Sequence, residues 1–94
     1  MIRVLVVDDQ VLVRSGFRII LETEPDIEVV GEAANGLEAV ARAAKLTPDV
    51  ICMDVEMPEM NGIDASRQIL AGAASGETRP APAILVLTTF GHEE

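Results

Sequence analysis

The sequence predicts an α/β protein built on a doubly wound parallel sheet with the strand order 2-1-3-4. Short runs of aliphatic residues alternate with segments whose apolar residues recur at helical spacing, giving strand-helix three times and then a fourth strand. This alternation is typical of parallel strands joined by right-handed crossovers, with helices on both faces of the sheet. The charged Glu28 in the second run favours an edge position for that strand, beside a buried first strand. Strands 1 and 3 then flank the switch point at which such sheets bind ligands.

The first half of the chain contains two of these strands. Residues 2–7 are nearly all aliphatic and predict a buried strand that stops at Asp8. Residues 10–22 predict an amphipathic helix, whose apolar face comprises Val13, Phe17, Ile20 and Leu21. Glu24-Pro25-Asp26 ends that helix, and residues 27–30 predict the second strand.

The second half begins with a helix-capping pattern, because Asn35 is followed three residues later by Glu38. The helix that follows is expected to present one apolar face, made of Leu37, Val40, Ala41 and Ala44. After Thr47-Pro48-Asp49, residues 50–53 predict the central strand and residues 63–70 a third helix. That helix is predicted to end at a Gly/Ala/Ser-rich connection over 71–79, which precedes the apolar strand 84–87.

Composition narrows the class of protein. A chain of 94 residues is enough for one domain, expected to be residues 1–94, and it contains no internal repeat. The hydrophobic content is 49%, with two Phe and no Trp or Tyr, so the core is expected to be aliphatic. The net charge of −9 argues against binding of nucleic acid or anionic membranes by this segment itself.

Location is inferred from two further features. The single cysteine, Cys52, lies in the predicted central strand and is interpreted as a buried residue of a reducing compartment. There is no signal-peptide pattern, and no apolar run approaches the ~18 residues needed to span a bilayer. The expected location is therefore cytoplasmic.

Acidic residues follow two strands that should be neighbours. Asp8 and Asp9 end the first strand, and Asp54 ends the third. Because the carboxyl ends of parallel strands meet at one edge, these carboxylates should converge, and they would repel one another unless a cation joined them. A few hard oxygen ligands suit Mg²⁺, whereas a buried acidic cluster with a purely structural role would be costly. A carboxylate beside Mg²⁺ can attack a phosphoryl group, and Asp54 is the candidate nucleophile. The hydroxyl of Thr88, at the end of the fourth strand, could bond a phosphoryl oxygen.

Three motifs lie at these strand ends: Val6-Val7-Asp8-Asp9, Asp54-x-x-Met57-Pro58-x-Met60-x-Gly62 and Leu85-Val86-Leu87-Thr88. Together they resemble the receiver domain of two-component response regulators. The resemblance implies a flavodoxin-like fold and a signalling switch in which a sensor histidine kinase phosphorylates Asp54 in the presence of Mg²⁺. It also implies that Asp9 binds the metal directly, that Asp8 acts largely through water, and that Glu56 contributes its backbone carbonyl. Thr88 resembles the hydroxyl whose reorientation toward the phosphoryl group triggers the switch.

Two further segments, residues 25–36 and 87–90, resemble the subfamily whose members carry a C-terminal LuxR/NarL-type helix-turn-helix. The resemblance therefore implies regulation of transcription through a DNA-binding output domain that lies outside this chain. It implies a phosphoacceptor switch rather than an enzyme, with at most self-directed phosphoryl transfer and hydrolysis.

The family pattern continues past residue 94 with a fourth helix, a fifth strand that ends in a lysine, and a fifth helix. The only lysine here, Lys45, is predicted on the second helix, badly placed for the acidic edge. We therefore expect Mg²⁺ binding but poor phosphorylation, because neutralisation of charge supplies most of the catalysis of phosphoryl transfer. The fourth strand would lie at an edge although it is fully apolar, so self-association through this strand and the bare sheet face beside it is expected.

Three alternatives stand beside the phosphorylated switch. A degenerate receiver, lacking the lysine, would act only as a protein-docking module. A haloacid-dehalogenase-like phosphatase also has a nucleophilic Asp and a second acid two residues later, which Asp54 and Glu56 match loosely, but it leaves Asp8 and Asp9 unexplained. A flavin-binding module would need a phosphate-binding loop rich in Ser, Thr or Gly after the first strand, where the sequence has Asp8-Asp9-Gln10.

Overall fold

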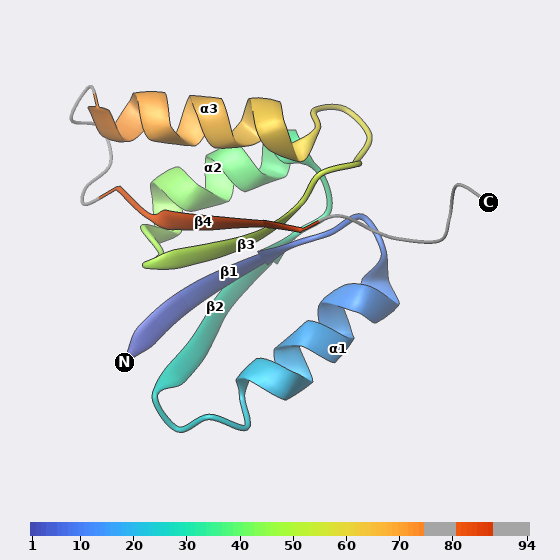
Figure 1. The fold of residues 1–94 in the computed structure, drawn as a ribbon, viewed down its shortest axis with the longest axis vertical. Helices are drawn as coiled ribbons and strands as arrows, with labels where there is room; N and C mark the ends of the chain where they lie inside the picture. Colours follow the sequence, from blue (N-terminus) through green and yellow to red (C-terminus); the bar gives the residue numbers. More distant parts are fainter. Residues whose placement is uncertain (75–80, 88–94) are drawn as a thin grey trace.

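The computed structural model describes residues 1–74 and 81–87, and these form one four-stranded parallel sheet with the order β2-β1-β3-β4 (Figure 1). This is the strand order predicted from the sequence. The elements in chain order are β1 (Ile2–Val7), α1 (Val11–Leu21), β2 (Ile27–Ala33), α2 (Gly36–Leu46), β3 (Val50–Asp54), α3 (Gly62–Ala74) and β4 (Ala83–Leu87).

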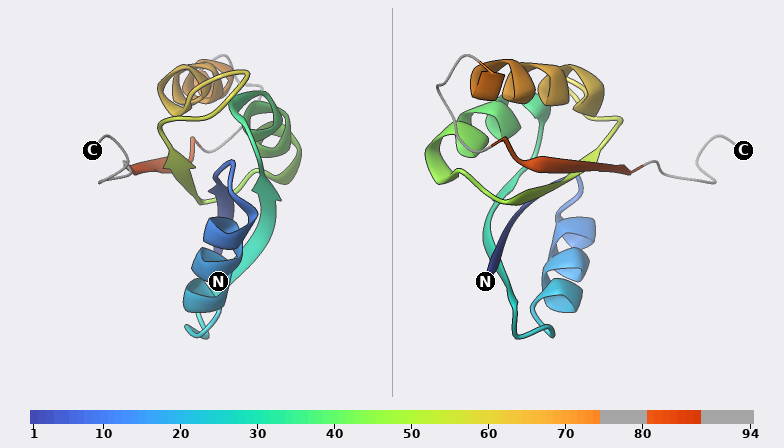
Figure 2. Two further views of the ribbon diagram at one scale, coloured as in Figure 1. Left: turned by 90° about the vertical axis from the view of Figure 1, so that its right-hand side faces the viewer. Right: turned by 60° about the vertical axis from the view of Figure 1, so that its left-hand side comes forward.

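The helices lie on both faces of the sheet, as Figure 2 shows: α2 and α3 cover one face, and α1 lies against the other. Alternate residues of β1 and β3 therefore enter two separate apolar clusters. Leu5, Ile51 and Met53 belong to the cluster beneath α2 and α3, and Val6 and Cys52 belong to the cluster beneath α1. Both clusters are aliphatic apart from Phe17, and Cys52 is buried as predicted.

Two elements are longer than the sequence predicted by three or more residues, whereas β3 and β4 are each longer by one. The second strand runs to Ala33 rather than Val30, and its pairing with β1 shifts register between Val4 and Leu5, where Gly31 enters the ladder. The third helix begins at Gly62 and continues to Ala74, through part of the Gly/Ala/Ser-rich segment that was expected to be a connection. Alanine has the highest helix propensity of all residues, so Ala71, Ala73 and Ala74 extend the helix despite the intervening glycine.

The predicted apolar faces of two helices were wrong in part. Ile20 on α1 is 66% exposed, while Phe17 and Leu21 pack on the sheet as expected. On α2 the predicted Leu37 is 52% exposed, and the buried residues are Gly36, Ala39 and Ala43, with Val40 packed beside them. The small residues are buried because they let α2 approach its neighbours closely: a Cβ atom on Gly36 would collide with the backbone carbonyl of Met60.

The two edges of the sheet differ in character. Glu28 lies in the edge strand β2, as predicted, and its side chain is exposed. At the other edge, β4 is apolar throughout, yet Leu85 is 55% and Val86 37% exposed. In the two stretches that the structure describes, no helix has the length and hydrophobicity to cross a bilayer.

Candidate metal centre

The carboxyl ends of β1 and β3 bring three aspartates together. Asp8 and Asp9 directly follow β1, and Asp54 is the last residue of β3. These strands are hydrogen-bonded neighbours, with Val7 opposite Met53, so the residues that follow them share one corner of the sheet. One carboxylate oxygen from each of Asp8, Asp9 and Asp54 lies within 4.8 Å of the others.

Asp54 is the most enclosed member of this acidic cluster. Its side chain is only 6% exposed, and it is the one buried charged residue among those the structure describes. Burial raises the pKa of this carboxyl above its usual value, and the neighbouring charges of Asp8 and Asp9 raise it further. Hydrogen bonding from the backbone of Glu56 and Val55 opposes this shift. The folded protein therefore holds Asp54 where a negative charge is unfavourable without a compensating cation.

Asp8 is held by contacts of its own. Its Oδ1 accepts a hydrogen bond of 2.9 Å from the backbone N–H of Gln10, and its own N–H donates to the carbonyl of Ala33 at 3.1 Å. Burial is the main cause that raises the pKa of the Asp8 carboxyl, and the charge of Arg14 lowers it. Asp9 is exposed, which leaves an open side on the cluster.

The loop after Asp54 is fixed by close backbone contacts. The N–H of Gly62 donates to the carbonyl of Val55 at 2.8 Å, and a Cβ atom on Gly62 would collide with the carbonyl oxygen of Asp54. The side chain of Glu56 is exposed, and the predicted role of its backbone carbonyl stays a prediction. Thr88, predicted to supply a hydroxyl, lies outside the described residues.

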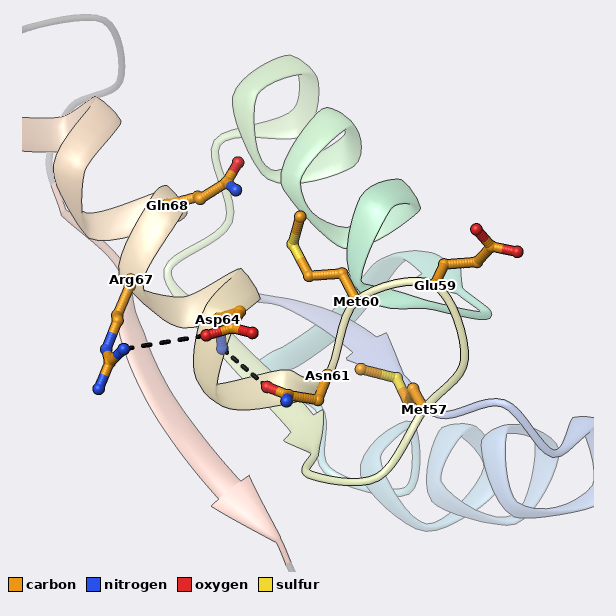
Figure 3. A pocket seen from close by; sticks show the side chains of 7 residues that line it. All are labelled: Met57, Glu59, Met60, Asn61, Asp64, Arg67 and Gln68. Atoms are coloured by element: carbon orange, nitrogen blue, oxygen red, sulfur yellow. Dashed lines mark hydrogen bonds and ion pairs between the residues drawn. The ribbon is translucent and has the colours of Figure 1, made fainter.

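The same loop forms one wall of a surface pocket of about 580 Å³, whose side chains are drawn in Figure 3. Oδ1 of Asn61, just before α3, accepts a hydrogen bond of 2.9 Å from the backbone N–H of Asp64. The carboxylate of Asp64 also forms an ion pair with Arg67 at 3.9 Å. Met57 and Met60 line the pocket and pack against the core beneath α2 and α3. None of the three aspartates of the acidic cluster lines this pocket, so it is separate from the candidate metal centre.

The acidic cluster fits a hard divalent cation. Three carboxylates at this spacing offer oxygen ligands only, and an exposed side leaves positions for water or a phosphoryl oxygen. Mg²⁺ prefers this combination of a few carboxylates and several exchangeable ligands. The raised pKa values of Asp8 and Asp54 are a second sign of fit, because a bound cation would favour their ionised forms.

Comparison of the sequence with known protein families assigns the chain to one of them. The family model described as the response regulator receiver domain matches residues 4–94. The chain belongs to the response regulator receiver family. It is therefore a receiver domain of a two-component system, as the motifs at the strand ends implied, and its parallel sheet is the flavodoxin-like fold that was predicted.

The relatives of this receiver domain are of two kinds. The transcriptional regulatory protein LiaR of Bacillus subtilis is 49% identical over 90 residues, which cover 96% of this chain and 40% of LiaR. A protein-glutamate methylesterase/protein-glutamine glutaminase of Alkalilimnicola ehrlichii is 59% identical over 69 residues, covering 73% of this chain and 18% of that enzyme. The chain thus spans less than half the length of either curated relative.

A solved structure supports the predicted subfamily. The signal receiver domain of the response regulator NarL from Mycobacterium tuberculosis superposes with a TM-score of 0.80 at 31% identity. The match covers 97% of this chain and 68% of that domain. Together with LiaR, this similarity confirms the predicted resemblance to LuxR/NarL-type regulators.

Proposed function

We propose that this receiver domain is a phosphorylation-dependent switch in which Asp54 accepts a phosphoryl group from a phosphohistidine of a sensor kinase. The observation that supports the proposal is the convergence of Asp8, Asp9 and Asp54 within 4.8 Å at the end of two adjacent strands. In this reaction a carboxylate oxygen of Asp54 forms a bond to phosphorus while the bond from phosphorus to the imidazole nitrogen breaks. The histidine leaves with the electron pair of that bond.

The residues of the acidic cluster have different parts in this proposal. Asp9 and Asp54 would hold Mg²⁺ directly, Asp8 would act largely through water, and the backbone carbonyl of Glu56 would be a further protein ligand. The ion supplies positive charge for the oxygens of the transferring phosphoryl group. The buried strand β3 and the contact of Gly62 with the Asp54 carbonyl keep the acceptor oxygen at a fixed place at the end of the sheet. Leu87, the last residue of β4, pairs with Asp54 in the sheet, and we assign the switch hydroxyl to Thr88, the next residue in the sequence.

The test of the site is a Mg²⁺ titration of the isotopically labelled protein, followed at the backbone amides of Asp9, Asp54 and Glu56. Saturable shifts confined to these loops are expected. The control is Asp54→Asn, which removes one ionised ligand at nearly constant volume and should weaken binding strongly. Loops that do not respond to Mg²⁺ would support instead the degenerate receiver that acts only as a protein-docking module.

Phosphorylation of this chain itself should be slow. Lys45 is its only lysine and lies in the last turn of α2, whereas the strands β1 and β3, at whose carboxyl ends the acidic cluster lies, end near the opposite end of that helix (Figure 1). After incubation with Mg²⁺ and a small acyl phosphate, intact-mass spectrometry should show the protein largely unmodified. Any phosphorylated fraction should require Mg²⁺ and be absent from Asp54→Asn. Rapid, stoichiometric gain of a phosphoryl group would contradict the need for a nearby lysine.

For the output we propose regulation of transcription through a DNA-binding domain, with no enzymatic activity in the receiver domain itself. The similarity to LiaR and to the NarL receiver domain supports this choice, and the methylesterase relatives define the second candidate. Sequencing of the natural reading frame distinguishes the two, because a helix-turn-helix and a methylesterase domain differ in length and motifs. An esterase domain would overturn the transcriptional assignment and leave the switch itself untouched.

A further inference from the structure

The side chain of Arg14 links the acidic cluster to the rest of the sheet. Arg14 lies in the second turn of α1, and its side chain is only 14% exposed. Its Nη1 donates a hydrogen bond of 2.6 Å to the backbone carbonyl of Asp8, and its Nε donates one of 3.0 Å to Oε1 of Glu32. One planar guanidinium therefore bridges the peptide between Asp8 and Asp9 and a carboxylate on β2.

Glu32 is itself held from three directions. Its second carboxylate oxygen, Oε2, accepts a hydrogen bond of 2.8 Å from Nη1 of Arg18, and its backbone carbonyl accepts one from Nη1 of Arg42 on α2. The side chains of Arg18 above all, and of Arg14, hold the pKa of the Glu32 carboxyl below its usual value and so favour its charged form. Arg14 thus has a rigid, charged anchor on the side facing away from the aspartates.

We propose that Arg14 is a positioning residue for the metal centre and that this role rests on the proposed function. The Asp8–Asp9 peptide carries two of the three carboxylates, and its carbonyl is fixed by Arg14 in place of water. Outer-shell hydrogen bonds of this kind keep ligands in the geometry that a small, strict cation such as Mg²⁺ requires. The planar fork of arginine is essential, because the single ammonium of lysine cannot present two fixed, divergent N–H groups to Glu32 and Asp8.

If Arg14 acted on the metal centre through its charge alone, its removal would change Mg²⁺ affinity in the direction opposite to that expected for a positioning residue. A positive charge near a cation site repels the cation, so removing it would tighten Mg²⁺ binding. Arg14→Lys keeps the charge and loses the bridge, whereas Arg14→Gln loses both. A positioning role predicts weaker binding in both variants, by about tenfold, at the low end of the effect of outer-shell partners on metal affinity. A charge effect predicts unchanged affinity in Arg14→Lys and tighter binding in Arg14→Gln.

The experiment measures Mg²⁺ affinity of the full chain by amide shifts, with Arg18→Lys as the matched control. Arg18 shares Glu32 with Arg14 but does not contact Asp8 in the structure, so this control should stay within about twofold of the unmodified protein. An unchanged affinity in Arg14→Lys, or a tighter one in Arg14→Gln, would overturn the assignment of Arg14.

A second measurement needs no metal and separates this inference from the proposed function. In Mg²⁺-free buffer, hydrogen exchange of the Gln10 amide, which donates to Asp8, should be faster in Arg14→Lys than in Arg18→Lys. Equal exchange in the two variants would refute positioning by Arg14. If the unmodified protein bound no Mg²⁺ while the Gln10 amide still responded to Arg14→Lys, the proposed function would fail and the positioning of the Asp8–Asp9 turn would stand.

Discussion

At the scale of single residues, the sequence predicted the acidic side chains but not what holds them. Asp8, Asp9 and Asp54 could be placed together because each follows a recognisable apolar strand, and the ends of parallel strands share an edge. Arg14 and Glu32 gave no such signal. Glu32 lies in the part of β2 beyond Gly31, which the pattern did not identify as strand, so no sequence argument could place it opposite α1.

Neutralising Asp54 should stabilise the metal-free protein. The pKa of Asp54 is raised in the fold, so between its ordinary value of 3.8 and its folded value the unfolded chain is the more ionised state. Stability is therefore lost as pH rises through this window and stays lower above it. Asp54→Asn should be more stable than the unmodified protein in Mg²⁺-free neutral buffer by about 1 kcal/mol, seen as a rise in Tm of ~5 °C. Thermal unfolding followed by circular dichroism measures the difference.

The gap between Asp54→Asn and the unmodified protein should close as pH falls toward 3.8. Glu32→Gln is a control of opposite sign, because the pKa of Glu32 is lowered and its carboxylate contributes stability that is present above pH 4.5 and lost as pH falls through the folded pKa. This variant should be less stable at neutral pH. An Asp54→Asn protein that melts below the unmodified one without Mg²⁺ would contradict the account of the cluster.

At the scale of the elements, strands were easier to predict than helix faces. β1, β3 and β4 are nearly continuous aliphatic runs and lie where the pattern placed them, whereas β2 begins at the predicted residue and runs three residues further. In α2 the buried face consists of Gly36, Ala39 and Ala43, and alanine carries little information about which side is buried. What selects this face is the close approach of α2 to the backbone at Met60, which is a tertiary contact between distant segments.

Two glycines give a matched test of close packing. A methyl group at Gly62 would collide with the Asp54 carbonyl and lie 2.9 Å from Cγ of Met53, so Gly62→Ala should destabilise the protein by about 2 kcal/mol. Gly16, inside α1, has no atom within 4 Å of an added Cβ, so Gly16→Ala should stabilise it by about 0.5–1 kcal/mol. Chemical denaturation of both variants measures these changes. Equal effects of the two substitutions would show that packing over Asp54 is looser than the structure indicates.

At the scale of the whole molecule, two surface properties oppose each other. The net charge of −9 keeps copies of the chain apart, whereas the described part of the sheet leaves the outer edge of β4 without a partner strand. Residues Ala83–Leu87 carry no charge, so two such strands could pair by a twofold axis without local repulsion. Edge pairing is therefore limited by the overall charge.

The 94-residue chain should self-associate, and increasingly so at higher salt, because salt screens repulsion between the acidic copies. Leu85→Lys, at a side chain 55% exposed on β4, should shift the weight-average mass back toward the monomer. Ile20→Lys, at a side chain 66% exposed on α1, is the control and should leave association unchanged. Sedimentation velocity over a range of concentrations measures the masses. A monomer at all concentrations and salt levels would disprove pairing through β4.

The pairing of β1 with β3 has a consequence for how the domain folds. The ligands of the proposed ion come from segments separated in sequence by α1, β2 and α2, so no local fragment contains a complete site. Affinity for Mg²⁺ can arise only after that long loop has closed, which is a slow, entropically costly step. An ion that binds only the native state slows unfolding when its site is absent from the transition state. Mg²⁺ should therefore lower the unfolding rate and leave the refolding rate nearly constant. Stopped-flow kinetics with and without Mg²⁺ would then report when this centre is assembled.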